Sequence, residues 1–105
     1  MGQFDVYDNP DAVSRSTYPC LLDIQSDLLG DLHTTVVIPL IPAEQATKLV
    51  FDRLTPIVEF NGKSWVVLTP QIAGVSRNRL GKPMGSVAAY RSELVGALDF
   101  LISGI

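Results

Sequence analysis

The chain has 105 residues, 47% of them hydrophobic and 18% charged, a composition that excludes a disordered chain and predicts one globular domain spanning residues 1–105. Its formal net charge of −3 argues against a protein that grips nucleic acid over its whole surface, which requires a basic field. The sequence has no apolar run of membrane-spanning length and no signal-peptide start, so we expect a cytoplasmic protein with no membrane partner.

Apolar and β-branched residues alternate with polar ones in several short runs, a pattern that predicts β-strands. Asn61-Gly62, between two of these runs, is the strongest hairpin signal because both residues tolerate a positive φ. Pro39 lies within the most apolar run and indicates a sheet edge or a bulge, since proline has no N–H to donate. In chain order, the expected strands are residues 3–7, 18–27, 33–41, 54–60 and 63–69.

The segments between the strands carry turn and loop signals, rich in Gly, Pro, Asn and Asp. Together with the strands they predict a mostly β domain, a small antiparallel barrel or sandwich, with a helix laid against it. The expected connections are a polar loop at 8–17, a short helix or irregular arm at 42–52, a short helical turn at 70–75 and a loop at 76–85.

The longest helix is expected at residues 86–102, with Ser86 as its N-cap. A projection at about 100° per residue gives one apolar stripe toward the core. The stripe consists of Val87, Tyr90, Leu94, Leu98 and Leu101, with Ile102 at its edge.

The opposite face of this helix is small and smooth, whereas a solvated face usually carries Lys, Glu and Arg. Gly96 costs about 1 kcal/mol of helix propensity relative to Ala, which a solvent-facing position has little reason to accept. Chance, packing on a loop or a second copy, and docking to a partner all account for such a face. Its members are Ala89, Ser92, Gly96, Asp99, Phe100 and Ser103.

The helix is followed by Gly104 and Ile105. Gly104 is expected to turn the chain off the helix in a left-handed conformation. Ile105 then offers an apolar side chain and a carboxylate, a combination suited to a partner with a groove and an arginine.

Candidate catalytic groups are few, because His33 is the only histidine and Cys20 the only cysteine. Cys20 shares the apolar face of its strand with Leu22 and Ile24, which favours a buried role over catalysis. His33 is favoured as a loop or strand-start residue, and one His with one Cys is no zinc site. We therefore expect no catalytic residue, no metal and no cofactor.

Two sets of charged residues have alternative explanations. Asp23 and Asp27 alternate on one strand face and could bind a hard cation, although a solvated face is favoured. Arg77, Arg79 and Lys82 could contact an acidic partner or RNA, although a solvated loop is favoured.

Five stretches stand out in chain order: QFDVY at 3–7, LLDIQSDLL at 21–29, VVIPL at 36–40, SWVVLTPQIAGV at 64–75, and the final Gly-Ile. Together they resemble the CcdB family of toxins from bacterial toxin–antitoxin pairs, over nearly the whole chain. The resemblance implies an SH3-like antiparallel β-barrel with a C-terminal α-helix, assembled as a homodimer.

The function that the resemblance implies is binding without catalysis. The toxin binds the A subunit of DNA gyrase and traps the enzyme on cleaved DNA. A CcdA-like antitoxin, partly disordered when alone, neutralises the toxin, and the two together repress their operon through DNA contacts made by the antitoxin. The sequence does not identify the residues that bind the antitoxin.

The gyrase-contacting positions that the resemblance implies include most of the smooth helix face. One departs from the family pattern: the best-known member has Trp, expected to stack on a gyrase arginine, where this chain has Ser103. Phe100 lies about 60° round the helix from that position. The implied set is Ser26, Leu28, Leu29, Ser92, Gly96, Asp99, Ile102, Ser103, Gly104 and Ile105.

Two alternatives stay open. One is an endoribonuclease toxin like those of the MazF/Kid group, which would use a basic groove with Arg77, Arg79 and His33. The other is a family relic that dimerises and binds antitoxin without poisoning gyrase.

Overall fold

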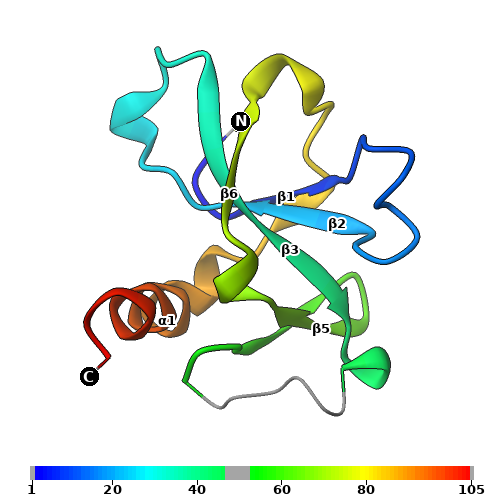
Figure 1. Ribbon diagram of the computed structural model, residues 1–105, viewed down its shortest axis with the longest axis vertical. Coiled ribbons are helices and arrows are strands. Elements are labelled where there is room, and N and C mark those ends of the chain that lie inside the picture. Colours follow the sequence, from blue (N-terminus) through cyan, green and yellow to red (C-terminus); the bar gives the residue numbers. More distant parts are fainter. Residues whose placement is uncertain (1, 47–52, 105) are drawn as a thin grey trace.

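The computed structural model, which describes residues 2–46 and 53–104, consists of antiparallel strands and one α-helix (Figure 1). The elements are β1 (Asp5–Asp8), β2 (Cys20–Asp23), β3 (Thr34–Pro42), β4 (Ile57–Phe60), β5 (Lys63–Val67), β6 (Ala73–Ser76), β7 (Gly85–Ser86) and α1 (Arg91–Ser103). The strand order is β4-β5-β3-β2-β1-β7, and β6 pairs with β3. The sheet curls into a nearly closed, SH3-like barrel, so the predicted fold is confirmed.

The long strand β3 organises the sheet. One edge of β3 pairs with β2, from Cys20↔Leu40 to Asp23↔Val37. The other edge is shared, because β6 pairs near its start and β5 near its end. The carbonyl of Pro39 accepts the Leu68 N–H at 3.1 Å on that shared edge. The Pro39 nitrogen, which carries no hydrogen, therefore points to the gap between β6 and β5, and its lack of an N–H removes no hydrogen bond between strands.

The hairpin between β4 and β5 is confirmed. Asn61 and Gly62 both adopt positive φ, 52° and 75°, as a tight turn between twisted strands requires. Trp65 in β5 is buried, as expected, and its indole N–H donates to the carbonyl of Phe60 at 3.2 Å.

The segments at 18–27 and 70–75 differ from their predictions. The strand expected at 18–27 ends at Asp23, because the chain then turns into a 3₁₀ helix at Asp27–Leu29. The helical turn expected at 70–75 is a 3₁₀ helix only over Thr69–Gln71, and β6 follows it. Ala and Gly have low strand propensity, so β6 exists through its pairing with β3.

The expected arm at 42–52 lies partly outside the described residues, and its described part holds a 3₁₀ helix at Ala43–Gln45. The loop expected at 76–85 contains a 3₁₀ helix at Arg77–Arg79 and reaches β7 at its end.

The C-terminal helix starts later than expected. A 3₁₀ turn at Ala88–Tyr90 precedes α1, and Ser86 belongs to β7. The prediction of Ser86 as the helix N-cap was therefore wrong, although its hydroxyl accepts the Ala88 N–H at 3.1 Å. The left-handed Gly104 is confirmed, with φ of 73° and its N–H bonded to the carbonyl of Phe100 at 2.9 Å.

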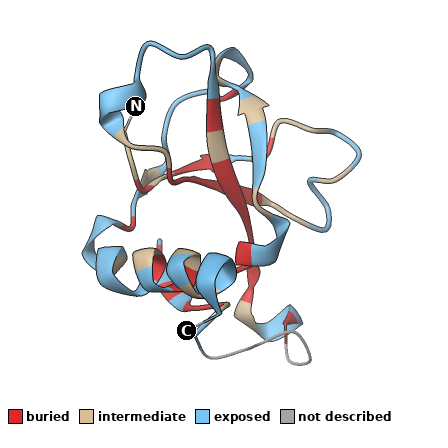
Figure 2. Ribbon diagram, turned by 60° about the vertical axis from the view of Figure 1, so that its left-hand side comes forward, coloured by how far each residue is buried: buried red, intermediate tan, exposed pale blue. Residues whose placement is uncertain are grey.

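The main core lies between the curled sheet and α1, and Figure 2 shows β2 and β3 as largely buried while most of α1 is exposed. Cys20, Leu22 and Ile24 face this core as predicted. From α1, Leu94 fills the core at 1% exposure, whereas Leu101 is 37% exposed. The prediction for Leu101 was wrong, because the buried residues of α1 are Leu94 and Ala97, in the first half of the helix.

A second, smaller core lies on the other face of β1, β2 and β3. The loop that starts at β6 and ends at β7 covers it and contributes Leu80. Asp23 and Thr35 are buried beside it, so the prediction of a solvated polar face was wrong for Asp23. The remaining members of this core are Tyr7, Leu21 and Val37, with Val75 half-buried against them.

Candidate partner-docking face

The predicted site residues lie on two elements at the same side of the molecule (Figure 1). Ser26, Leu28 and Leu29 belong to residues 24–33, which join β2 to β3 and are called here the docking loop. The others lie on or just after α1. Leu28 is 94% exposed and Ile102 is 84% exposed. Ile105 lies outside the described residues.

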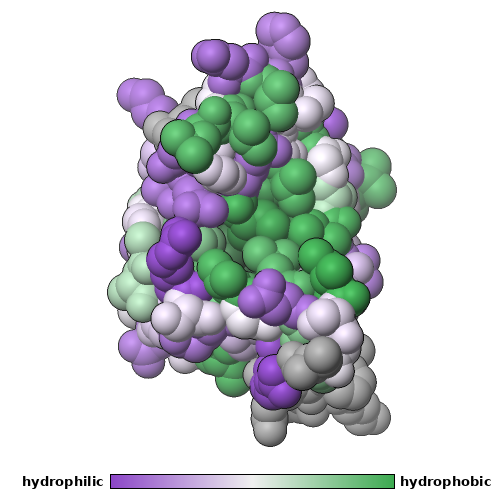
Figure 3. Space-filling view, turned by 90° about the vertical axis from the view of Figure 1, so that its left-hand side faces the viewer, coloured by the Kyte–Doolittle hydropathy of each residue, from purple (hydrophilic) through white to green (hydrophobic). Residues whose placement is uncertain are grey.

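Figure 3 views the molecule from this side and shows hydrophobic side chains gathered across the centre of the face, with hydrophilic ones around them. The exposed large hydrophobic residues of the two elements are Leu28, Leu29 and Leu32 from the loop, and Leu101 and Ile102 from the helix. An apolar area of this kind on a small protein is typical of an interaction site.

Two neighbouring rows of α1 build the helix side of the face. Residues at i, i+4, i+7 and i+11 share one row on a helix. The first row is mostly apolar and contains Arg91, Val95, Leu98 and Ile102. The second row is small or acidic and contains Ser92, Gly96, Asp99 and Ser103.

Gln3 joins the helix to the docking loop. Its side-chain oxygen accepts a hydrogen bond from Arg91 Nη1 at 3.0 Å, at the start of the first row. Its backbone N–H donates to Asp27 Oδ1 at 2.8 Å, and its side-chain nitrogen donates to the Ile24 carbonyl at 3.1 Å. Sequence reasoning missed the roles of Gln3 and Arg91, because 88 residues separate them and no periodicity links them.

The second row of α1 is exposed and smooth, as predicted. A methyl group on Gly96 would meet no heavy atom within 4 Å apart from its chain neighbours and the backbone of its own helix. The Ser103 hydroxyl donates to the Asp99 carbonyl at 2.7 Å, so its proton is already engaged in a hydrogen bond within the helix. Neighbouring Phe100 is half-buried, and the Arg53 guanidinium lies 4.7 Å from its ring centre. Phe100 is therefore engaged within the chain and does not stand in for a free tryptophan.

The candidate reactive groups are placed as follows. Cys20 is 4% exposed, and burial, aided by the charge of Asp8, raises the pKa of its thiol to about 11, as an inert core residue requires. His33 is exposed in the docking loop. Arg77 is turned inward: its Nε donates to the Leu32 carbonyl at 3.2 Å, so the expectation of a solvated side chain was wrong.

Within residues 2–46 and 53–104, no group of three or more His, Cys, Asp or Glu side chains is placed to hold a metal ion. Over the same residues, no helix combines the length and the apolar character that crossing a membrane requires.

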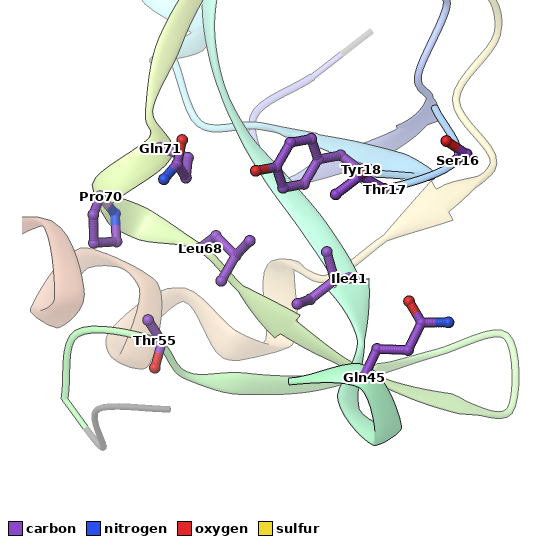
Figure 4. Close-up of a pocket in the computed structure, with 9 residues that line it drawn as sticks. All are labelled: Ser16, Thr17, Tyr18, Ile41, Gln45, Thr55, Leu68, Pro70 and Gln71. Atoms are coloured by element: carbon purple, nitrogen blue, oxygen red, sulfur yellow. The ribbon is translucent and has the colours of Figure 1, made fainter. Parts of the chain in front are cut away.

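A groove of about 440 Å³ lies elsewhere on the molecule, between the segment before β2, the end of β3 and the 3₁₀ turn at Thr69–Gln71 (Figure 4). It is uncharged, and no residue of the docking face lines it. Its lining residues are Ser16, Thr17, Tyr18, Ile41, Gln45, Thr55, Leu68, Pro70 and Gln71.

The fold and this face define a small SH3-like barrel protein that exposes one apolar surface built from a loop and a terminal helix. The family model described as CcdB protein matches residues 3–104. The chain therefore belongs to the CcdB family, and this membership implies a toxin of a toxin–antitoxin pair.

Proposed function

We propose that this protein binds the A subunit of DNA gyrase through the face formed by the docking loop and α1, and traps gyrase on cleaved DNA. The protein acts by binding and not by catalysis. It works in the cytoplasm as a homodimer, and a CcdA-like antitoxin neutralises it and co-represses the operon with it.

The observation that carries this proposal is the exposure of Leu28 and Ile102, which belong to two elements that are far apart in sequence but lie on one side of the molecule. A monomer gains nothing from holding two large apolar side chains in water. Their burial in a partner provides the free energy of binding, while the smooth second row allows close approach.

The replacement of Trp by Ser103 changes how the face meets an arginine of gyrase. The second row offers the exposed carboxylate of Asp99, which makes no hydrogen bond or ion pair with the described residues. A carboxylate binds a guanidinium through charge-assisted hydrogen bonds. We infer that Asp99 takes the arginine that an aromatic ring stacks on in the best-known family member, and that Asp99→Asn weakens gyrase binding about tenfold.

The decisive experiment uses three matched substitutions. The loop between β1 and β2 lies on the other side of the molecule from the docking loop in Figure 1, and Val13 within it is 87% exposed. We expect Leu28→Asp and Ile102→Asp to abolish the trapping of linear DNA by gyrase, ATP and plasmid, and Val13→Asp to leave it intact. All three sites are exposed, so thermal unfolding should shift little.

Induction of the protein in a gyrase-bearing host gives the outcomes that would overturn the proposal. Toxicity with cleaved RNA and no trapped DNA would establish an endoribonuclease instead. Absence of toxicity, with antitoxin still bound, would establish a relic.

The homodimer and the antitoxin are tested separately. Sedimentation of the purified protein should give twice the mass of 11.4 kDa. A peptide of the antitoxin C-terminal region should dissociate the protein from gyrase. A monomeric mass would remove the homodimer, and a peptide without effect would remove the antitoxin.

A further inference from the structure

Asp23 is the single buried carboxylate among the described residues, with 2% of its surface exposed. It ends β2 and stands where the chain enters the docking loop. Its Oδ1 accepts the Thr35 hydroxyl at 2.7 Å and the Gln25 N–H at 3.2 Å. Because a buried carboxylate is tolerated only where donors satisfy it, these bonds fix the backbone at the loop entry.

Arg77 contacts the docking loop at both ends. Its Nη1 lies 4.0 Å from Asp23 Oδ2 at the entry. Its Nε donates to the carbonyl of Leu32 at 3.2 Å, and its backbone N–H donates to the carbonyl of His33 at 2.8 Å, both at the exit. The planar guanidinium allows one side chain to serve these separate acceptors.

The middle of the loop is ordered by its own polar groups. The Gln25 side chain donates to the Thr34 carbonyl at 3.1 Å, and the Ser26 hydroxyl accepts the Leu28 N–H at 3.2 Å. The first bond ties the loop to the start of β3 and the second lies within the loop, while Leu28 projects into solvent. A free loop would turn such a side chain toward the protein, and ordering it before binding lowers the entropic cost of association.

We propose that Arg77 is a positioning residue, which joins Asp23 to Leu32 and His33 and thereby holds the docking loop in the conformation that presents Leu28 to a partner protein. The loop conformation is a property of the free protein. The identity of the partner as gyrase rests on the proposed function.

The first test measures amide hydrogen exchange in the free, full-length protein. Arg77→Met should raise exchange at residues 26–32 about tenfold and leave the core strands unchanged. Arg79→Met is the matched control, because Arg79 lies in the same 3₁₀ turn with an exposed side chain. Arg77→Lys keeps the positive charge but lacks the planar guanidinium with its several donors, so it should give an intermediate increase in exchange.

The second test measures the affinity for a gyrase A fragment. Arg77→Met should weaken binding about tenfold, and Leu28→Ala should then cost less than it does in the parent protein, because the loop no longer presents that side chain. A simple loss of stability would leave the cost of Leu28→Ala unchanged.

Two results would overturn the positioning role: unchanged exchange at residues 26–32 in Arg77→Met, or an equal rise across the whole chain. If the parent protein does not bind gyrase at all, the proposed function fails, and the exchange experiment still decides whether Arg77 fixes the loop.

Discussion

In α1, backbone hydrogen bonds and the inward packing of Leu94 and Ala97 hold the exposed rows in place. In the docking loop, hydrogen bonds made by the side chains of Asp23, Gln25 and Arg77 hold the exposed residues in place. The exposed residues of the helix can therefore change at little structural cost, whereas the loop depends on particular polar side chains behind it. The two halves of the proposed binding face are therefore held in place in different ways, the helix by its backbone and core packing and the loop by particular side-chain contacts.

The largest expected effect tests how the helix is held. Leu94→Ala should lower the free energy of unfolding by roughly 2–5 kcal/mol, because it leaves a cavity in the main core. Leu101→Ala is the matched control, and it should cost under about 1 kcal/mol because that side chain is partly in water. Urea unfolding followed by Trp65 fluorescence measures both, and equal losses would show that the outer end of α1 is packed after all.

The next effect tests how the loop is held. Asp23→Ala should lower the free energy of unfolding by roughly 2–3 kcal/mol, because it removes the acceptor of the buried Thr35 hydroxyl and the partner of Arg77. Asp31→Ala, at an exposed position of the same loop, should stay within about 0.5 kcal/mol. Similar urea midpoints for the two variants would contradict this account of the loop.

A pH series tests the core packing beneath α1 separately from the polar contacts of the docking loop, because Cys20 lies in that core. The unfolded thiol ionises near 9.0, while burial holds the folded pKa near 11. The folded state therefore keeps a proton that the unfolded state releases, and stability falls as pH rises from about 9 to about 11. Tyr7, whose pKa burial also raises, acts in the same direction above 10.0.

Comparison of the parent protein with Cys20→Ala isolates the thiol. Between pH 9 and pH 11, we expect the free energy of unfolding of the variant to fall by on the order of 2 kcal/mol less than that of the parent protein. Urea titrations at intervals of pH measure the slopes, and parallel curves would show that the thiol does not contribute.

The smallest effect concerns the second row of α1. Gly96→Ala should raise the free energy of unfolding by about 0.5–1 kcal/mol, since the added methyl meets no atom of another segment within 4 Å and alanine favours the helix. Gly96→Gln should fold equally well but bind gyrase more weakly, because it fills the smooth surface. Stability that falls in both variants would mean that a neighbouring segment packs on this row.

The sequence determined much of the barrel by itself. Alternation placed Cys20, Leu22 and Ile24 in the core, Asn61-Gly62 specified the hairpin, and Gly104 specified the end of α1. These features depend on residues close together in the chain, and period and turn chemistry report such local relations directly.

Only the tertiary structure decided how the docking face is assembled. Asp23 was predicted to be solvated because alternation cannot show that Arg77, 54 positions later, lies beside it. Leu101 was predicted to be buried because periodicity shows which residues share a helix face, but not how far along the helix that face is buried. The strand β6 and the link from Gln3 to Arg91 likewise depend on pairings between distant segments, which no local pattern encodes.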